Sequence, residues 1–124
     1  MAILLIYRPG SAKVTDEFFK ELTIYLEAMS LYNCQLVIAG DLNINVEDAD
    51  GLNTRKLLDL LQSFDCTQRV VGPTQRCGGS LDHVITRSED PVIDMNVDPP
   101  GIISDHSLIT WKMEFNRQRL RMTP

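Results

Sequence analysis

Three short segments of this sequence combine a carboxylate with an amide, a hydroxyl or an imidazole, and each adjoins an apolar run. They are Gly40-Asp41-Leu42-Asn43, Ser80-Leu81-Asp82-His83 and Ser104-Asp105-His106. Carboxylate oxygens bind divalent cations such as Mg²⁺, and carboxylates and imidazoles can transfer protons. If the three segments converge, they supply the groups needed to hold a metal ion and cleave a phosphate ester.

The first segment follows the apolar run 36–39, so Asp41 is expected where a buried strand ends. Sites of α/β folds form at such strand ends, and Gly40 would let the chain bend sharply there. Asn43 could donate its amide to a phosphate oxygen. Taken by itself, however, the segment is better explained as a turn, because Gly, Asp and Asn all favour turns.

The second and third segments complement each other. Asp82 alternates with Val84 and therefore points toward the core or a cleft, where an unpaired carboxylate is costly. His106 is a suitable partner, since a carboxylate fixes the tautomer of an imidazole and stabilises its charged form. The alternatives are an exposed Asp on an edge strand and, for Asp105-His106, a capped turn. We expect His83 to be structural or exposed rather than catalytic.

The elements that must position these groups begin with a strand, a helix and a strand. The apolar run 2–7 predicts a buried strand that ends in a turn. Apolar residues recur at helical spacing over 15–30, with Thr15 as the expected N-cap. A second short strand is expected over 35–40. This order implies parallel strands joined by a right-handed crossover.

Further along, Asn53 or Thr54 can cap a second amphipathic helix, and strands are expected over 81–86, 91–97 and 107–115. We therefore predict an α/β fold with a mixed β-sheet and two helices on one face. The first two strands are apolar on both faces, as in sheets covered on both sides. The chain has few elements left for the second face, so a partner or a larger domain is expected to cover it.

Length and charge exclude several classes of protein. A chain of 124 residues suits one domain, and its net charge of −5 argues against non-specific attraction to nucleic acid. The exception is the basic tail, 116–124.

Three cysteines (Cys34, Cys66 and Cys77) suggest reduced thiols in an intracellular protein. A zinc site from Cys66, Cys77 and His83 has poor support because its spacing is irregular, and no apolar run is long enough to cross a membrane.

In this order, the three segments resemble the last three signature motifs of the endonuclease/exonuclease/phosphatase superfamily. The stretches Ile6-Tyr7-Arg8-Pro9-Gly10, 72–75 and 81–87 resemble more closely the apurinic-type endonuclease domain of non-LTR retrotransposons. The resemblance implies half of a four-layer αββα sandwich. Residues 1–115 would be a partial domain, its C-terminal half, followed by the tail.

The resemblance also implies a role for each matching residue. Asp41 would activate the attacking water or assist the leaving group, and Asn43 would orient the scissile phosphate. Tyr7 matches a tyrosine near the phosphate in DNA-cleaving members of the superfamily. These roles suit in-line displacement at phosphorus, which needs an activated water, a charge clamp and a positioned leaving group.

The third segment would complete the site. Asp105, together with Asp41, would bind Mg²⁺ or Mn²⁺. His106 would contact the phosphate and stabilise its developing charge, held in place by Asp82. Ser104 would contact these site residues rather than the metal ion or the phosphate itself.

The sequence departs from the family pattern in one respect. Family members carry an early Asn motif and a metal-binding Glu in a first half, and no residue before Tyr7 can supply that Glu. We therefore expect weak or absent DNA endonuclease activity from this chain by itself. The alternatives are a phosphatase or lipid phosphodiesterase, or a non-catalytic interaction module. Its exposed sheet face would then pair with another chain or with the missing half. The expected location is intracellular, and a DNA substrate would favour the nucleus.

Overall fold

The structure is a computed structural model. It describes residues 1–8, 14–32, 34–45, 51–72, 74, 81–98 and 108–114.

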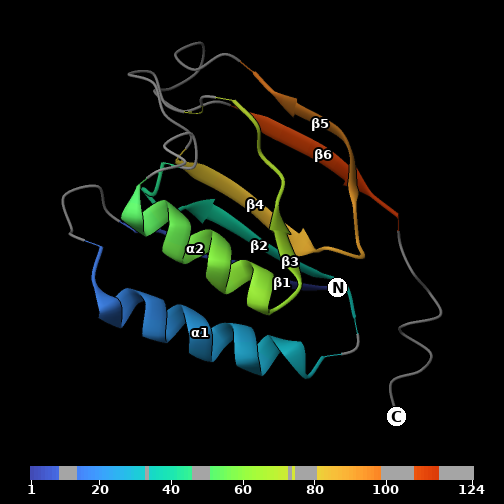
Figure 1. Cartoon of the computed structure of the whole chain (residues 1–124). Coiled ribbons are helices and arrows are strands. Elements are labelled where there is room, and N and C mark those ends of the chain that lie inside the picture. Colours follow the sequence, from blue (N-terminus) through green and yellow to red (C-terminus); the bar gives the residue numbers. More distant parts are fainter. Residues whose placement is uncertain are drawn as a thin grey trace.

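The described residues form an α/β fold with a mixed four-stranded sheet, two helices on one face of it and a separate two-stranded ribbon (Figure 1). In chain order the elements are β1 (Ala2–Leu5), α1 (Asp16–Ser30), β2 (Leu36–Asp41), α2 (Leu52–Ser63), β3 (Cys66–Gln68), β4 (Asp82–Arg87), β5 (Val92–Val97) and β6 (Ile109–Met113). The strand order in the sheet is β1-β2-β4-β3, with β1 parallel to β2 and the other pairs antiparallel. The predicted mixed sheet and parallel crossover are confirmed.

The helices begin in different ways. Thr15 caps α1 as predicted, because its hydroxyl accepts a hydrogen bond from the Phe18 amide at 3.4 Å. The prediction for α2 was wrong: its N-cap is Gly51, which offers no side chain. Instead, the Thr54 hydroxyl donates to the carbonyl of Asn45 at 2.7 Å and ties the helix to the preceding loop.

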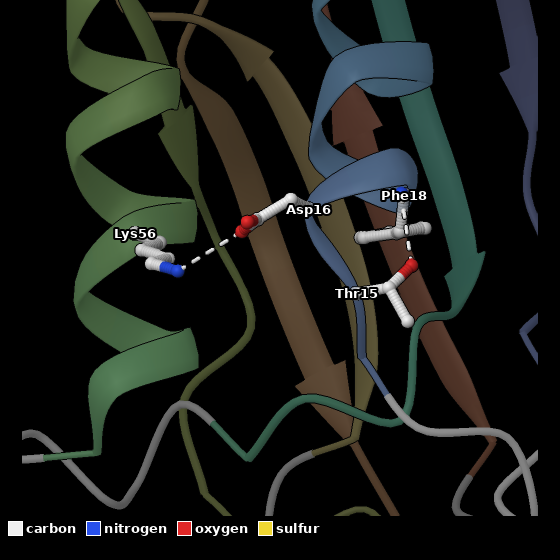
Figure 2. A network of polar contacts seen from close by, with 4 residues as sticks. All are labelled: Thr15, Asp16, Phe18 and Lys56. Atoms are coloured by element: carbon white, nitrogen blue, oxygen red, sulfur yellow. Dashed lines mark hydrogen bonds and ion pairs between the residues drawn. The ribbon is translucent and has the colours of Figure 1, made fainter.

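The first turns of the two helices are joined by an ion pair. The Lys56 ammonium lies 3.3 Å from a carboxylate oxygen of Asp16, next to the Thr15 cap (Figure 2). Both side chains are largely exposed, so this pair contributes little to stability. The helices are held mainly by the apolar core beneath them, whose members include Leu22, Leu26, Leu57, Leu61, Ile38 and Ile85.

The second face of the sheet is covered only in part. The β5–β6 ribbon packs over Val37 and Val84 with the side chains of Val97 and Trp111, among others. The same face of β1 stays open to solvent: Ile3 and Leu5 are 62% and 76% exposed, and Tyr7, just past the end of the strand, is 74% exposed. The expectation of an uncovered second face therefore holds for β1 and not for β2 and β4. Among the described helices, none is long and apolar enough to span a bilayer.

Candidate active site

Two of the predicted site carboxylates lie directly opposite each other. Asp41 ends β2, Asp82 begins β4, and the antiparallel register pairs these two residues. Opposed residues of antiparallel strands point to the same face, with Cβ atoms about 5 Å apart. Alternation along β4 places both side chains on the face of Val84, away from the helices.

Tyr7 extends this pair into a row across three strands. The backbone bonds from Ile6 N to Ala39 O and from Arg8 N to Asp41 O continue the β1–β2 ladder past the end of β1, at 3.0 and 2.8 Å. Alternation along this extended segment puts Tyr7 on the same face as Asp41. The phenol of Tyr7 and the carboxylates of Asp41 and Asp82 therefore lie at one end of the sheet face opposite the helices.

Asn43 fixes the direction of the Asp41 side chain. The backbone amide of Asn43 donates to Oδ1 of Asp41 at 2.9 Å, which closes an Asx-type turn. Asn43 adopts a left-handed backbone with φ of 51°, a conformation that Asn tolerates better than most residues. Its side-chain amide donates to the carbonyl of Arg8 at 2.9 Å. The turn interpretation is therefore confirmed, and the turn gives the Asp41 carboxylate a defined direction.

Two positioning groups were missed in the sequence. Thr74 is completely buried, and its hydroxyl oxygen accepts hydrogen bonds from the backbone amides of Leu81 and Asp82 at 3.0 and 3.1 Å. This contact fixes the start of β4 and hence the place of Asp82. The second missed group is Arg8, which donates to the loop after β2. The only sequence signal for either residue was its place in a family-like stretch.

His83 lies on the opposite face of β4 and has a structural role, as expected. It is 2% exposed, and its Nε2 lies 2.9 Å from the carbonyl of Ile44. Because a carbonyl can only accept, Nε2 carries the proton of the neutral ring. Nδ1 is buried and has no hydrogen-bond partner among the described residues. Burial lowers the pKa of His83 to about 4, against smaller opposing effects of the Ile44 bond and of Asp82.

The sequence matches the model of a known protein family. The model of the Endonuclease/Exonuclease/phosphatase family matches residues 7–106, which include Tyr7, Asp41 and Asp82. The chain belongs to this family. A search of curated proteins found no match.

Two solved structures show the same fold. The endonuclease domain of TRAS1, a telomere-specific non-LTR retrotransposon, matches with a TM-score of 0.70 and 15% identity, over 90% of this chain and 55% of that one. The 3′ phosphatase NExo (D146N) from Neisseria, bound to a product DNA hairpin, matches with a TM-score of 0.65 and 20% identity, over 91% of this chain and 61% of that one. The chain therefore spans little more than half of each matched domain.

Enzymes of this family typically use a divalent metal ion, and the described residues offer part of a suitable donor set. Asp41 and Asp82 present hard carboxylate oxygens side by side, and two like charges at opposed positions repel unless a cation or donors offset them. Within the residues that the structure describes, no three His, Cys, Asp or Glu side chains cluster as metal ligands. Asp105, His106, Ser104 and Cys77 lie outside these residues.

Proposed function

We propose that this chain carries part of the active site of a divalent-metal-dependent phosphodiesterase that cleaves DNA. The observation that supports the proposal most is the row of Tyr7, Asp41 and Asp82 on the sheet face opposite the helices. Asn43 holds the central carboxylate of this row in one direction. In a chain of this family, such a row of side chains fits the binding and cleavage of a phosphate ester better than it fits a purely structural role.

In the proposed reaction, a water oxygen bonds to phosphorus and the bond from phosphorus to the leaving sugar oxygen breaks. Asp41 would accept a proton from the water or deliver one to the leaving oxygen. Asn43 would orient the phosphate. Asp82 would hold His106, which would stabilise the charge that develops on the phosphate oxygens. Mg²⁺ or Mn²⁺, bound by Asp41 and Asp105, would supply further charge stabilisation.

DNA is the substrate that we favour. Tyr7 is 74% exposed beside the carboxylates, where an aromatic ring can contact a nucleic-acid strand. The TRAS1 domain is an endonuclease, and NExo was solved with a DNA hairpin. The second candidate function is removal of a 3′ phosphate from DNA, which the likeness to NExo favours. Either substrate agrees with an intracellular location.

Asp41→Asn is expected to lower the rate of plasmid nicking about 100-fold, since an amide cannot transfer the proton. The assay follows conversion of supercoiled plasmid to the open-circular form in Mg²⁺, at protein concentrations high enough to detect weak activity. Asp59→Asn is the matched control, because Asp59 is an exposed carboxylate on α2, on the far side of the sheet. Its nicking rate should equal that of the wild type.

Equal nicking by wild type and Asp41→Asn would refute the role of Asp41. An oligonucleotide that ends in a 3′ phosphate, incubated with the same proteins, separates the two candidate functions. Release of inorganic phosphate without nicking would favour the phosphatase. Neither product from the wild type would support the non-catalytic alternative.

We also propose that the open face of β1 packs against a further polypeptide segment. Ile3 and Leu5 are apolar and largely exposed, and they continue the face that the β5–β6 ribbon covers over β2 and β4. The TRAS1 and NExo chains contain 45% and 39% of residues with no counterpart here, by subtraction from the covered 55% and 61%. We propose that the corresponding part of the domain covers this face, residues 1–115 being the C-terminal half of that domain.

In the chain by itself, the open face of β1 should promote self-association. We expect wild-type chain to sediment as dimers or larger species at micromolar concentrations, and Leu5→Lys to sediment as a monomer, because a charge on an apolar contact surface opposes burial. Leu31→Lys is the control, since Leu31 is 86% exposed at the end of α1 and does not belong to β1. A wild type that stays monomeric, with the same sedimentation as Leu5→Lys, would contradict the prediction.

A further inference from the structure

Arg8 is a buried cation that joins the segment after β1 to the loop after β2. It is 8% exposed. Its Nε donates to the carbonyl of Leu42 at 2.7 Å, and its Nη2 donates to the carbonyl of Asn43 at 2.9 Å. We infer that Arg8 is a positioning residue, which sets the direction of the Asp41 carboxylate through Asn43. The catalytic consequence rests on the function proposed above, whereas the structural consequence does not.

The contacts between the two segments are reciprocal. The backbone amide of Arg8 donates a hydrogen bond to the carbonyl of Asp41, and its side chain donates to the carbonyls of Leu42 and Asn43. In return, the Asn43 side chain donates to the carbonyl of Arg8. The guanidinium also lies 5.9 Å from the centre of the Phe18 ring in the first turn of α1. Residue 8 is thereby fixed to the loop and to the helix at once.

This arrangement has a direct effect on Asp41. Asn43 must keep its left-handed backbone for its amide to reach Oδ1 of Asp41. The guanidinium holds the carbonyls of the two peptide groups that flank the Cα of Asn43, so it restrains this conformation. Without the two bonds, we expect the turn to relax and the carboxylate to rotate away from its place beside Asp82.

Lysine cannot replace arginine here. The planar guanidinium presents donors in a fixed fork that spans two neighbouring carbonyls, while an ammonium is a single point donor on a flexible chain. Arg8→Lys therefore keeps the charge and most of the volume and removes the geometry. Arg87 supplies a matched control at the opposite end of β4. Its Nε and Nη2 donate to backbone carbonyls of Cys34, Met29 and Tyr32 after and within the last turn of α1.

The test compares wild type, Arg8→Lys and Arg87→Lys by two measurements. The first is amide hydrogen exchange by NMR, in which the backbone amide of Asn43 reports local opening of the turn and that of Ile38, in the centre of β2, reports global unfolding. We expect Arg8→Lys to raise the relative exchange rate of Asn43 at least about tenfold, the equivalent of one lost hydrogen bond, and Arg87→Lys to leave it unchanged.

The second measurement is single-turnover nicking as a function of plasmid concentration. We expect Arg8→Lys to lower the maximal rate about tenfold with little change in the half-saturating concentration, and Arg87→Lys to affect neither, since only Arg8 orients the reacting group. If the wild type does not nick DNA, the proposed function fails while the exchange measurement still decides the role of Arg8. Unchanged relative exchange of Asn43 in Arg8→Lys would overturn the inference.

Discussion

Gly40→Ala is expected to abolish the cooperative unfolding transition of this chain. A Cβ at position 40 would lie 1.8 Å from the carbonyl oxygen of Ile6, much closer than two non-bonded atoms can approach. The neighbour is backbone, and it cannot retreat easily because Ile6 N is bonded to Ala39 O at 3.0 Å. Gly40 also has φ of 140°, where other residues are strained. We expect a loss of roughly 3 to 5 kcal/mol, comparable to the whole stability of a small domain.

Gly72→Ala is the matched control for this prediction. Gly72 also has a positive φ, of 99°, yet a Cβ there would meet no atom of the described residues within 4 Å. This variant should therefore lose only the conformational part, about 1 to 2 kcal/mol. Urea unfolding followed by circular dichroism compares the two variants: Gly72→Ala should keep a cooperative transition, and Gly40→Ala should show none. Similar losses in the two variants would show that the contact with Ile6 does not restrict position 40.

The close approach at Gly40 illustrates how far the sequence predicts the fold. The ends of α1 and β2 were predicted to within one residue, and β1 begins as predicted but ends two residues earlier, at Leu5. An apolar run and a capped helical periodicity are local signals. β3 was missed, since three residues are too few to show a period. The α2 cap was wrong because the Thr54 hydroxyl bonds to a loop carbonyl nine residues earlier, a tertiary contact that no local pattern reveals.

The candidate site shows the same division between local signals, which the sequence reveals, and tertiary contacts, which it does not. Residue types and strand ends were sufficient to select Asp41 and Asp82. Their opposition depends on the register of β2 and β4, which the sequence does not determine without the intervening connection. Arg8 looked like the start of a turn, and its role depends on contacts 34 and 35 residues away along the chain. Local patterns thus select candidate reacting groups, and long-range contacts identify the residues that hold them.

His83 should make the stability of this chain fall steeply in mild acid. Its pKa is lowered from 6.5 to about 4, chiefly by burial. Protonation would place a cationic N–H at Nδ1, for which the described part of the chain offers no acceptor. Below pH 6.5 the unfolded chain binds a proton that the folded chain does not, so the stability present above this pH is lost as the pH falls toward 4. The pKa difference corresponds to about 3 kcal/mol.

His83→Gln isolates this contribution. Glutamine has no titratable group, and its amide can donate to the Ile44 carbonyl that His83 Nε2 now contacts. Free energies of unfolding are measured for both proteins between about pH 7 and pH 4, where titrating carboxylates affect the two alike. We expect the wild type to lose about 3 kcal/mol more than His83→Gln over this range. Parallel pH profiles would mean that the folded chain protonates His83 as readily as the unfolded chain, and hence that the ring is not confined beneath the Ile44 carbonyl.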